Sequence, residues 1–252
     1  MCLAFVAIDA HARYPLVIAA NRDEYHARVA EPAHWWPEGI LAGRDLLAGG
    51  TWLGVSRQGR WALVTNVRDA GHNDKSAPSR GSLVVDALGD PQAPMLAAAA
   101  ALRGPRRNGF NLLVGDRASA AYASNRASGA LLLEPGIHGL SNHLLDSDWP
   151  KVARGRHAFK ASLAGADVDI ESVFAQLRDA RPAAEADLPH TGVPLQWEQR
   201  LSSAFIVSPA YGTRCSTVVT LARDGVVRFI ERSFDAGGAM REEIAHEFAL
   251  AA

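Results

Sequence analysis

The 252-residue sequence contains only two cysteines, Cys2 and Cys215, and almost no net charge. Two cysteines in so long a chain exclude a disulfide framework and a zinc site built from four cysteines. Lysine and arginine number 26 and aspartate and glutamate number 27, which gives a formal net charge of −1. Because phosphate binding needs a basic surplus, we expect no nucleic-acid partner.

Long apolar runs are also missing. The first run, Leu3–Ile8, is too short to span a bilayer and has no basic leader, so we expect neither a membrane span nor a signal peptide. No lipidation signal occurs at either end. These features predict a protein of a reducing, cytoplasmic compartment. The remaining composition, 48% hydrophobic and 21% charged residues, is ordinary for a globular protein and excludes disorder as the dominant state.

Short apolar runs between turn-like residues predict many strands, with helices grouped between them. The expected strands are Leu3–Ile8, Leu16–Ala20, Thr51–Ser56, Trp61–Asn66, Asn108–Gly115, Ala120–Ser124, Ala130–Leu133, Ser203–Val207, Thr217–Ala222 and Val226–Glu231. The expected helices are Ser82–Leu88, Pro94–Leu102, Trp149–Ala164, Asp169–Ala180 and Met240–Leu250, and Arg181–Gln196 is expected to be a surface loop. This order favours one domain, residues 1–252, with sheets covered by helices rather than an alternating parallel sheet.

Cys2 directly follows the initiator methionine. If Met1 is removed, as small second residues generally permit, one residue carries both a thiol and a free α-amine. An α-amine has a reference pKa of about 7.7–8.0 and can act as a base near neutral pH. A thiol with an adjacent base is an activated nucleophile. The alternative is that Cys2 is a small buried hydrophobic residue on a first strand.

Four polar residues, Asn21-Arg22-Asp23-Glu24, follow the apolar strand Leu16–Ala20 abruptly. Beside Cys2, the fixed charge of Arg22 would favour the thiolate. Asp23 would hold or orient the α-amine, which completes a set of nucleophile, base and orienting group. The alternative is a solvated turn at the end of the strand.

Three asparagines, Asn66, Asn111 and Asn142, follow strands or precede turns. A side-chain amide can donate a hydrogen bond to a developing oxyanion, although an asparagine at a strand end is more often a turn former. Arg214 lies just before an apolar strand, where it can pair with an acid or bind a substrate carboxylate. We expect the neighbouring Cys215 to be structural.

Several segments together resemble the NRDE family, also called the transport and Golgi organization protein 2 family. These segments are Met-Cys-Leu at the start, NRDE at 21–24, GGTWLGVS at 49–56, LVTNVRD at 63–69 and YGTRCSTVV at 211–219. That family is similar to the N-terminal-nucleophile hydrolases, in particular the cysteine branch that includes bile-salt hydrolase and penicillin V acylase. The resemblance implies an α+β fold, a four-layer α/β/β/α sandwich of two antiparallel sheets.

The resemblance also implies roles at the start of the chain. Cys2 would match the nucleophile, Arg22 its supporting arginine and Asp23 the acid that contacts the α-amine. In the hydrolases the acid usually follows the arginine by a few residues, whereas here the two are adjacent. Because neighbouring residues on a strand point to opposite faces, either the strand ends by Arg22 or only one of the pair faces Cys2.

The same resemblance places Asn66 and Asn142 near the oxyanion positions and Arg214 near a second arginine. It therefore predicts an amidohydrolase that acts on a linear or acyl amide, or an ester, without a cofactor. The nine histidines show no zinc-protease spacing, so no metal site is expected.

The family relation also supports an alternative, a non-catalytic carrier of haem or an acyl lipid that uses the same cleft. Conventional haem ligation would need an axial cysteine or histidine, for which Cys2, His11 and His26 are the candidates. The sequence contains no Cys-Pro motif and no Cys-x-x-Cys-His attachment motif.

Overall fold

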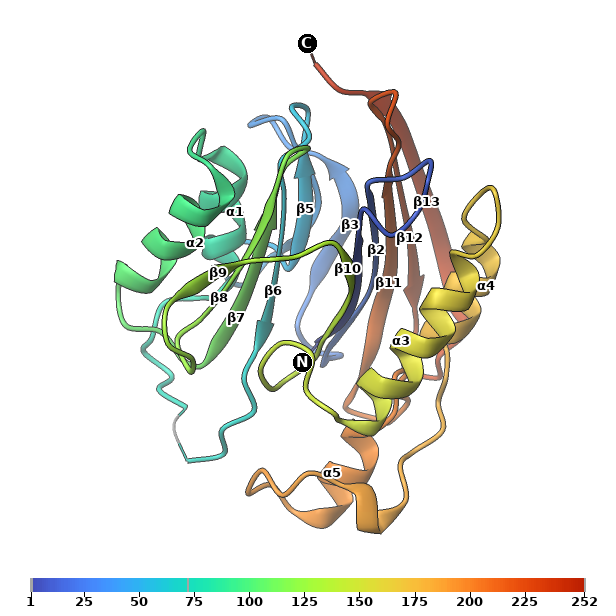
Figure 1. Ribbon diagram of the computed structural model, residues 1–252. Coiled ribbons are helices and arrows are strands. Elements are labelled where there is room, and N and C mark those ends of the chain that lie inside the picture. Colours follow the sequence, from blue (N-terminus) through green and yellow to red (C-terminus); the bar gives the residue numbers. More distant parts are fainter. Residues whose placement is uncertain (1, 72, 252) are drawn as a thin grey trace.

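Two antiparallel sheets form the centre of the computed structural model, which describes residues 2–71 and 73–251 (Figure 1). Sheet I has the strand order β10-β1-β2-β11-β12-β13, with β1 (Cys2–Ile8), β2 (Leu16–Tyr25), β10 (Gly136–Leu140), β11 (Tyr211–Leu221), β12 (Val226–Phe234) and β13 (Met240–Ala249). Sheet II runs in sequence order, with β3 (Ala30–Trp35), β4 (Ile40–Asp45), β5 (Leu53–Ser56), β6 (Trp61–Asn66), β7 (Phe110–Gly115), β8 (Ala120–Ser124) and β9 (Ala130–Leu132).

Helices cover the outer face of each sheet (Figure 1). On sheet II lie α1 (Gly81–Gly89) and α2 (Pro94–Arg103), and on sheet I lie α3 (Pro150–Ser162) and α4 (Ile170–Leu177). A short 3₁₀ helix, η1 (Glu185–Asp187), precedes α5 (Leu195–Leu201). The expected four-layer α/β/β/α sandwich is confirmed. None of the helices described is long and apolar enough to cross a membrane.

The inner strands β1, β2 and β11 of sheet I are buried on both faces, which explains their apolar runs. Val6 and Ile18 point toward sheet II and pack in the core between the sheets. Phe5, one residue along, points the other way and meets Phe159 of α3, with ring centroids 5.9 Å apart. A Cβ on Gly155 would lie 2.0 Å from the Phe5 ring, so this glycine lets α3 approach the sheet closely.

The predicted helix Met240–Leu250 is wrong, because these residues form β13 at the edge of sheet I. Glutamate and alanine favour a helix, but Ile244, His246 and Phe248 alternate with more exposed neighbours, which is the period of a strand. Pairing with β12 and the contact of Phe248 with Trp35, at 4.8 Å between ring centroids, override the local preference.

The predicted strand Ser203–Val207 is also wrong, because this segment has no regular secondary structure. It is apolar because it packs against the core, and its backbone is satisfied locally. The Phe205 N–H donates to the Asp179 carbonyl at 2.9 Å, and the Ile206 N–H donates to the Thr213 hydroxyl at 2.9 Å. Burial with irregular hydrogen bonds therefore produced a strand-like pattern.

Candidate functional site

Cys2 is the first residue of β1 and lies opposite Arg22 of β2, and Arg22 in turn lies opposite Cys215 of β11. Residues paired across an antiparallel sheet share a face. Cys2, Arg22 and Cys215 therefore form a row across three neighbouring strands. Because Val6 shares the face of Cys2 and packs between the sheets, the row points toward sheet II.

The segment Asn21-Arg22-Asp23-Glu24 is part of β2, so the expectation that this strand ends at Ala20 is wrong. Tyr25 pairs with Tyr211, and hydrogen bonding to β11 keeps the polar segment extended. Asn21, Arg22 and Asp23 are all at least 95% buried, which excludes the solvated-turn alternative. Asn21 points to the helical side, where its amide donates to the carbonyls of Leu177 and Ala204 at 2.8 Å each.

Asp23 lies on the opposite face of β2 from Arg22, as the alternation of a strand requires. It is also one residue further along β2 than the partner of Cys2, so it lies beside the amino end of β1. The backbone nitrogen of Cys2 belongs to the main chain and not to one face. Asp23 therefore lies near the predicted α-amine without sharing the face of the thiol. Met1, whose removal would free that amine, lies outside the described residues.

Lys151, the second residue of α3, lies under this end of β2 and is only 3% exposed. Its ammonium nitrogen has no hydrogen-bond partner within the described ranges. Burial lowers the pKa of Lys151 to about 8, while the nearby Asp23 carboxylate acts in the opposite direction. Burial raises the pKa of Asp23, and the charge of Lys151 together with the 2.7 Å hydrogen bond from the Thr213 hydroxyl counteracts it.

The sequence does not mark Lys151 as a residue near the site, because no local pattern predicts that it is buried. A lysine in the first turn of an amphipathic helix normally lies at the surface. Only the close approach of α3 to sheet I, which Gly155 permits, buries it.

Arg22 is fixed in place by two neighbours. Its guanidinium lies 4.5 Å from the ring centroid of Trp52 and 3.6 Å from the Asp45 carboxylate. Burial raises the pKa of the Cys2 thiol, whereas the charge of Arg22 and the backbone N–H of Asp23 lower it. Arg22 thus reduces the cost of forming a thiolate at Cys2, as the sequence predicts.

The thiol of Cys2 opens into a cleft of about 460 Å³, which we call the Cys2 cleft. The residues of the cleft used below are Cys2, Arg22, Glu24, Arg28, Asp45, Trp52, Asn66, Lys75 and Arg80. Asn66, at the end of β6, brings an amide group from sheet II to the same cleft as the thiol from sheet I. Sheet I therefore brings the predicted nucleophile to this cleft, and sheet II brings the amide of Asn66.

Asn142 lies behind Asn66 and is fully buried. Its amide nitrogen donates to the Asn66 side-chain oxygen at 3.0 Å and to the Asn66 carbonyl at 3.3 Å. The Asn66 side-chain oxygen is engaged by Asn142, and its amide nitrogen donates one long hydrogen bond, to the Val67 carbonyl at 3.4 Å. One amide N–H of Asn66 is therefore left for the cleft. Of the two expected oxyanion residues, the structure brings Asn66 to the cleft and places Asn142 where it orients Asn66.

A hydrogen-bond network anchors Asn142 to both sheets. The Ser141 hydroxyl lies 3.2 Å from the Asn142 side-chain oxygen and 3.3 Å from the Cys2 carbonyl oxygen. The Thr65 hydroxyl donates to the Ser141 carbonyl at 2.7 Å, and the Asn111 amide donates to Thr65 at 3.0 Å. Asn111 is thus a buried structural residue, not a group of the cleft.

Arg214 lies on the other side of Arg22. It occupies a bulge in β11 and donates to the backbone carbonyls of Tyr25 at 3.1 Å and His26 at 3.0 Å. With Cys215, it lines a neighbouring cavity of about 430 Å³, which Arg22 and Trp52 separate from the Cys2 cleft. The structure therefore does not bring Arg214 into the cleft that Cys2, Arg22, Asp23 and Asn66 line.

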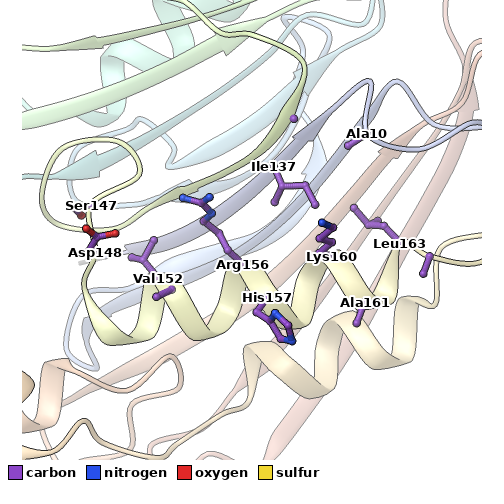
Figure 2. Close-up of a pocket in the computed structure, with 13 residues that line it drawn as sticks. Ala10, Ile137, Ser147, Asp148, Val152, Arg156, His157, Lys160, Ala161 and Leu163 are labelled. Carbon is purple, nitrogen blue, oxygen red and sulfur yellow. The ribbon is translucent and has the colours of Figure 1, made fainter.

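A larger cavity of about 1000 Å³ runs along α3 and β10. Figure 2 shows Arg156, His157 and Lys160 of α3 on one side and Ile137 of β10 on the other. None of the predicted site residues lines it. Volume alone therefore does not locate the site.

The three candidate haem ligands do not gather at one place. His11 lies in the turn after β1, at the opposite end of that strand from Cys2, and its Nδ1 accepts the Arg13 N–H at 3.1 Å. His26 Nε2 lies 3.0 Å from the Ser208 carbonyl oxygen and borders the Cys215 cavity. Within the described ranges, no group of three or more potential ligands could hold a metal ion.

Comparison with known proteins agrees with the sequence motifs. The sequence model of the Transport and Golgi organisation 2 family matches residues 1–236. This chain belongs to that family. The Transport and Golgi organization protein 2 homolog of Bos taurus is 34% identical over 275 residues, covering 99% of each chain. The Homo sapiens homolog is 33% identical over 257 residues, covering 92% of this chain and 93% of that protein.

Among solved structures, one described as a Caenorhabditis elegans N-acylethanolamine-hydrolyzing acid amidase (NAAA) ortholog is similar in fold. It matches with a TM-score of 0.52 and 15% identity, covering 86% of this chain and 92% of that one. At this identity the likeness concerns the fold, which is that of the N-terminal-nucleophile hydrolases. The fold implied by the sequence motifs is thereby confirmed.

Proposed function

We propose that this protein is an N-terminal-nucleophile amidohydrolase that cleaves a linear or acyl amide, or an ester, through Cys2 once Met1 is removed. One observation carries the proposal: the thiol of Cys2 and the amide of Asn66 face one cleft, while Asp23 lies beside the backbone nitrogen of Cys2. This arrangement supplies a nucleophile, an oxyanion donor and an orienting acid for a base that is part of the nucleophile itself.

In the first half of the reaction, the Cys2 α-amine takes the proton from the thiol. The sulfur then attacks the carbonyl carbon, a C–S bond forms, and the carbonyl π electrons move to oxygen. When the tetrahedral intermediate collapses, the C–N bond breaks and the leaving amine takes the proton from the α-ammonium group. A thioester on Cys2 results. Asp23 holds the amine in position, and Arg22 stabilises the negative charge that develops on sulfur.

In the second half, the α-amine takes a proton from water as the water oxygen attacks the thioester carbonyl. The C–S bond breaks, the sulfur is reprotonated, and the carboxylic acid leaves. Asn66 donates to the oxyanion in both halves, and Asn142 keeps its amide turned toward the cleft. A reducing compartment would keep Cys2 in the thiol form that this cycle requires.

The fold comparison supports the reaction class, since the Caenorhabditis elegans neighbour is described as an acid amidase ortholog. Fold kinship does not establish a reaction, so the proposal depends on the residues of the Cys2 cleft.

The test is to incubate the full chain with a panel of fatty acyl amides, acyl amino acids and thioesters, and to quench early for intact-mass analysis. We expect release of the acid and a mass increase equal to one acyl group on the peptide that begins with Cys2. Hydrolysis that is unchanged in Cys2→Ala would contradict the proposal, as would the absence of both hydrolysis and acyl-enzyme across the panel.

Haem or acyl-lipid carriage is the alternative that the family relation raises. The charged walls of the Cys2 cleft, which include Arg22, Arg28 and Asp45, do not fit a largely apolar macrocycle, and the candidate ligands are dispersed. A haem titration checks this alternative directly. A Soret shift in the wild type that is lost in Cys2→Ala would support haem carriage, and no shift in either protein would exclude it.

A further inference from the structure

Two of the four cationic side chains described in the Cys2 cleft, Arg22 and Arg28, are already paired with carboxylates. Asp45 accepts from Arg28 at 2.6 Å and lies 3.6 Å from Arg22. Glu24 lies 4.0 Å from Arg28. These two arginines and two carboxylates compensate one another, so they offer little net charge to an incoming molecule.

Arg80 differs from them. It lies just before α1, lines the same cleft as Cys2, and donates a hydrogen bond to the Gly109 carbonyl at 3.2 Å. In the described part of the chain, no carboxylate forms an ion pair with it. Burial lowers the pKa of Arg80, and the charges of Cys2 and Glu24 act in the opposite direction. The Cys2 cleft thus contains a partly buried guanidinium that no carboxylate of the described residues pairs with in a salt bridge.

We propose that Arg80 binds an anionic group, a carboxylate or a phosphate, on the molecule that enters the Cys2 cleft. A guanidinium presents a planar pair of donors that matches either oxyanion, and partial burial strengthens the pairing. If the protein is the hydrolase proposed above, on which this part of the inference rests, its substrate is an anionic acyl amide or ester.

The preference can be measured without any hydrolysis, by alkylation of the Cys2 thiol. Iodoacetate is an anion and iodoacetamide is its neutral analogue. With either reagent, the sulfur forms a bond to the methylene carbon, iodide leaves and the thiol proton passes to solvent. The measurement is the ratio of the iodoacetate rate to the iodoacetamide rate at Cys2, read from peptide masses and normalised to the ratio for free N-acetylcysteine amide.

We expect the normalised ratio to exceed one in the wild type and to fall about five- to tenfold in Arg80→Gln, because a charge-assisted hydrogen bond is lost. Arg80→Lys keeps the charge and should retain most of the preference. Arg28→Gln is the matched control: it removes an equal charge from the same cleft, but from a residue that Asp45 already neutralises. A ratio that is unchanged in Arg80→Gln, or that falls equally in Arg28→Gln, would overturn the proposal.

A second arm distinguishes the two kinds of anion. Inorganic phosphate and N-acetylglycine are each tested for protection of Cys2 against iodoacetamide. Protection by one of them, lost in Arg80→Gln, assigns the group as phosphate or carboxylate; protection by neither would overturn the proposal. Selective alkylation in a protein that hydrolyses nothing would support the anion site and contradict the proposed function, whereas hydrolysis of neutral amides without this selectivity would do the reverse.

Discussion

The two cysteines of this chain lie on either side of Arg22, and the comparison shows what makes one of them a candidate nucleophile. Both pair with Arg22 across the sheet, and each borders a cavity, of about 460 Å³ for Cys2 and 430 Å³ for Cys215. Burial raises the pKa of both thiols, and that of Cys215 lies well above its ordinary value.

What differs is the rest of the surroundings. Cys215 is 5% exposed in the middle of the chain, and its thiol is hydrogen-bonded to the buried Glu231 carboxylate. Cys2 begins the first strand, has the Asn66 amide across its cleft and has Asp23 beside its backbone nitrogen. A neighbouring arginine is therefore not sufficient for the proposed reaction, which also uses the Asn66 amide and, once Met1 is removed, the α-amine of Cys2.

The largest expected effect separates the two thiols directly. Cys2→Ala should lower kcat for a panel substrate by about 10³-fold or more, because the group that forms the acyl-enzyme is gone. Cys215→Ala should retain activity to within a few-fold. Steady-state rates on the two purified variants check this prediction, and equal losses would remove the distinction between the two sides of Arg22.

The proposed oxyanion donor on the Cys2 side, Asn66, gives the next largest expected effect. Asn66→Ala should reduce kcat by about 10²–10³-fold, as loss of one oxyanion donor does, and should leave the rate of Cys2 alkylation by iodoacetamide unchanged. Asn142→Ala should cause a smaller loss, because Asn66 stays in the cleft but is no longer held. An Asn66→Ala variant with normal kcat would exclude Asn66 from the reaction.

Because Lys151 is buried, the free energy of unfolding should depend on pH. Its pKa is about 8 in the folded protein against 10.5 as the reference value, so the unfolded chain binds more protons between these pH values and stability rises with pH there. The cost of about 3 kcal/mol is fully present below pH 8 and absent above pH 10.5. Relative to Lys151→Met, the wild type should therefore gain unfolding free energy across this range.

Urea denaturation at several pH values measures that gain. The matched control is Lys160→Met, which removes an exposed lysine from the same helix and should show no such pH trend. If the unfolding free energies of the wild type and Lys151→Met changed in parallel from pH 7 to 10.5, the ammonium group would not be buried as described.

The smallest expected effect lies on the Cys215 side. Cys215→Ala should lower the free energy of unfolding by about 1–2 kcal/mol, because Glu231 loses a hydrogen-bond donor in the core. Cys215→Ser keeps a donor and should cost less. Chemical denaturation at neutral pH checks both values, and a loss of catalysis in Cys215→Ser without a loss of stability would assign Cys215 a chemical role.

The sequence was sufficient for the features that depend on local pattern. The apolar run of β1 and the hairpin of β5 and β6 could be read directly, and position and residue type made Cys2, Arg22 and Asn66 candidates, which the structure places along one cleft. The alternation of a strand predicts that Arg22 and Asp23 cannot both face the Cys2 thiol. The structure agrees, but Asp23 lies beside the backbone nitrogen of Cys2, which belongs to neither face.

Other features depend on packing between distant segments. Residues 240–249 have helix-forming composition, and only pairing with β12 makes them a strand. Lys151 is buried because α3 approaches sheet I closely, and Arg80 reaches the cleft because α1 starts beside it. No local signal distinguishes such residues from surface lysines and arginines.

The most direct test of the account compares two preparations of the protein that differ only in residue 1. One begins with Cys2, released by cleavage of an N-terminal tag, and the other retains Met1, as verified by intact mass. The account predicts acyl-enzyme formation and turnover in the first preparation alone, because only there does Cys2 carry a free α-amine. Equal turnover in both preparations would contradict it.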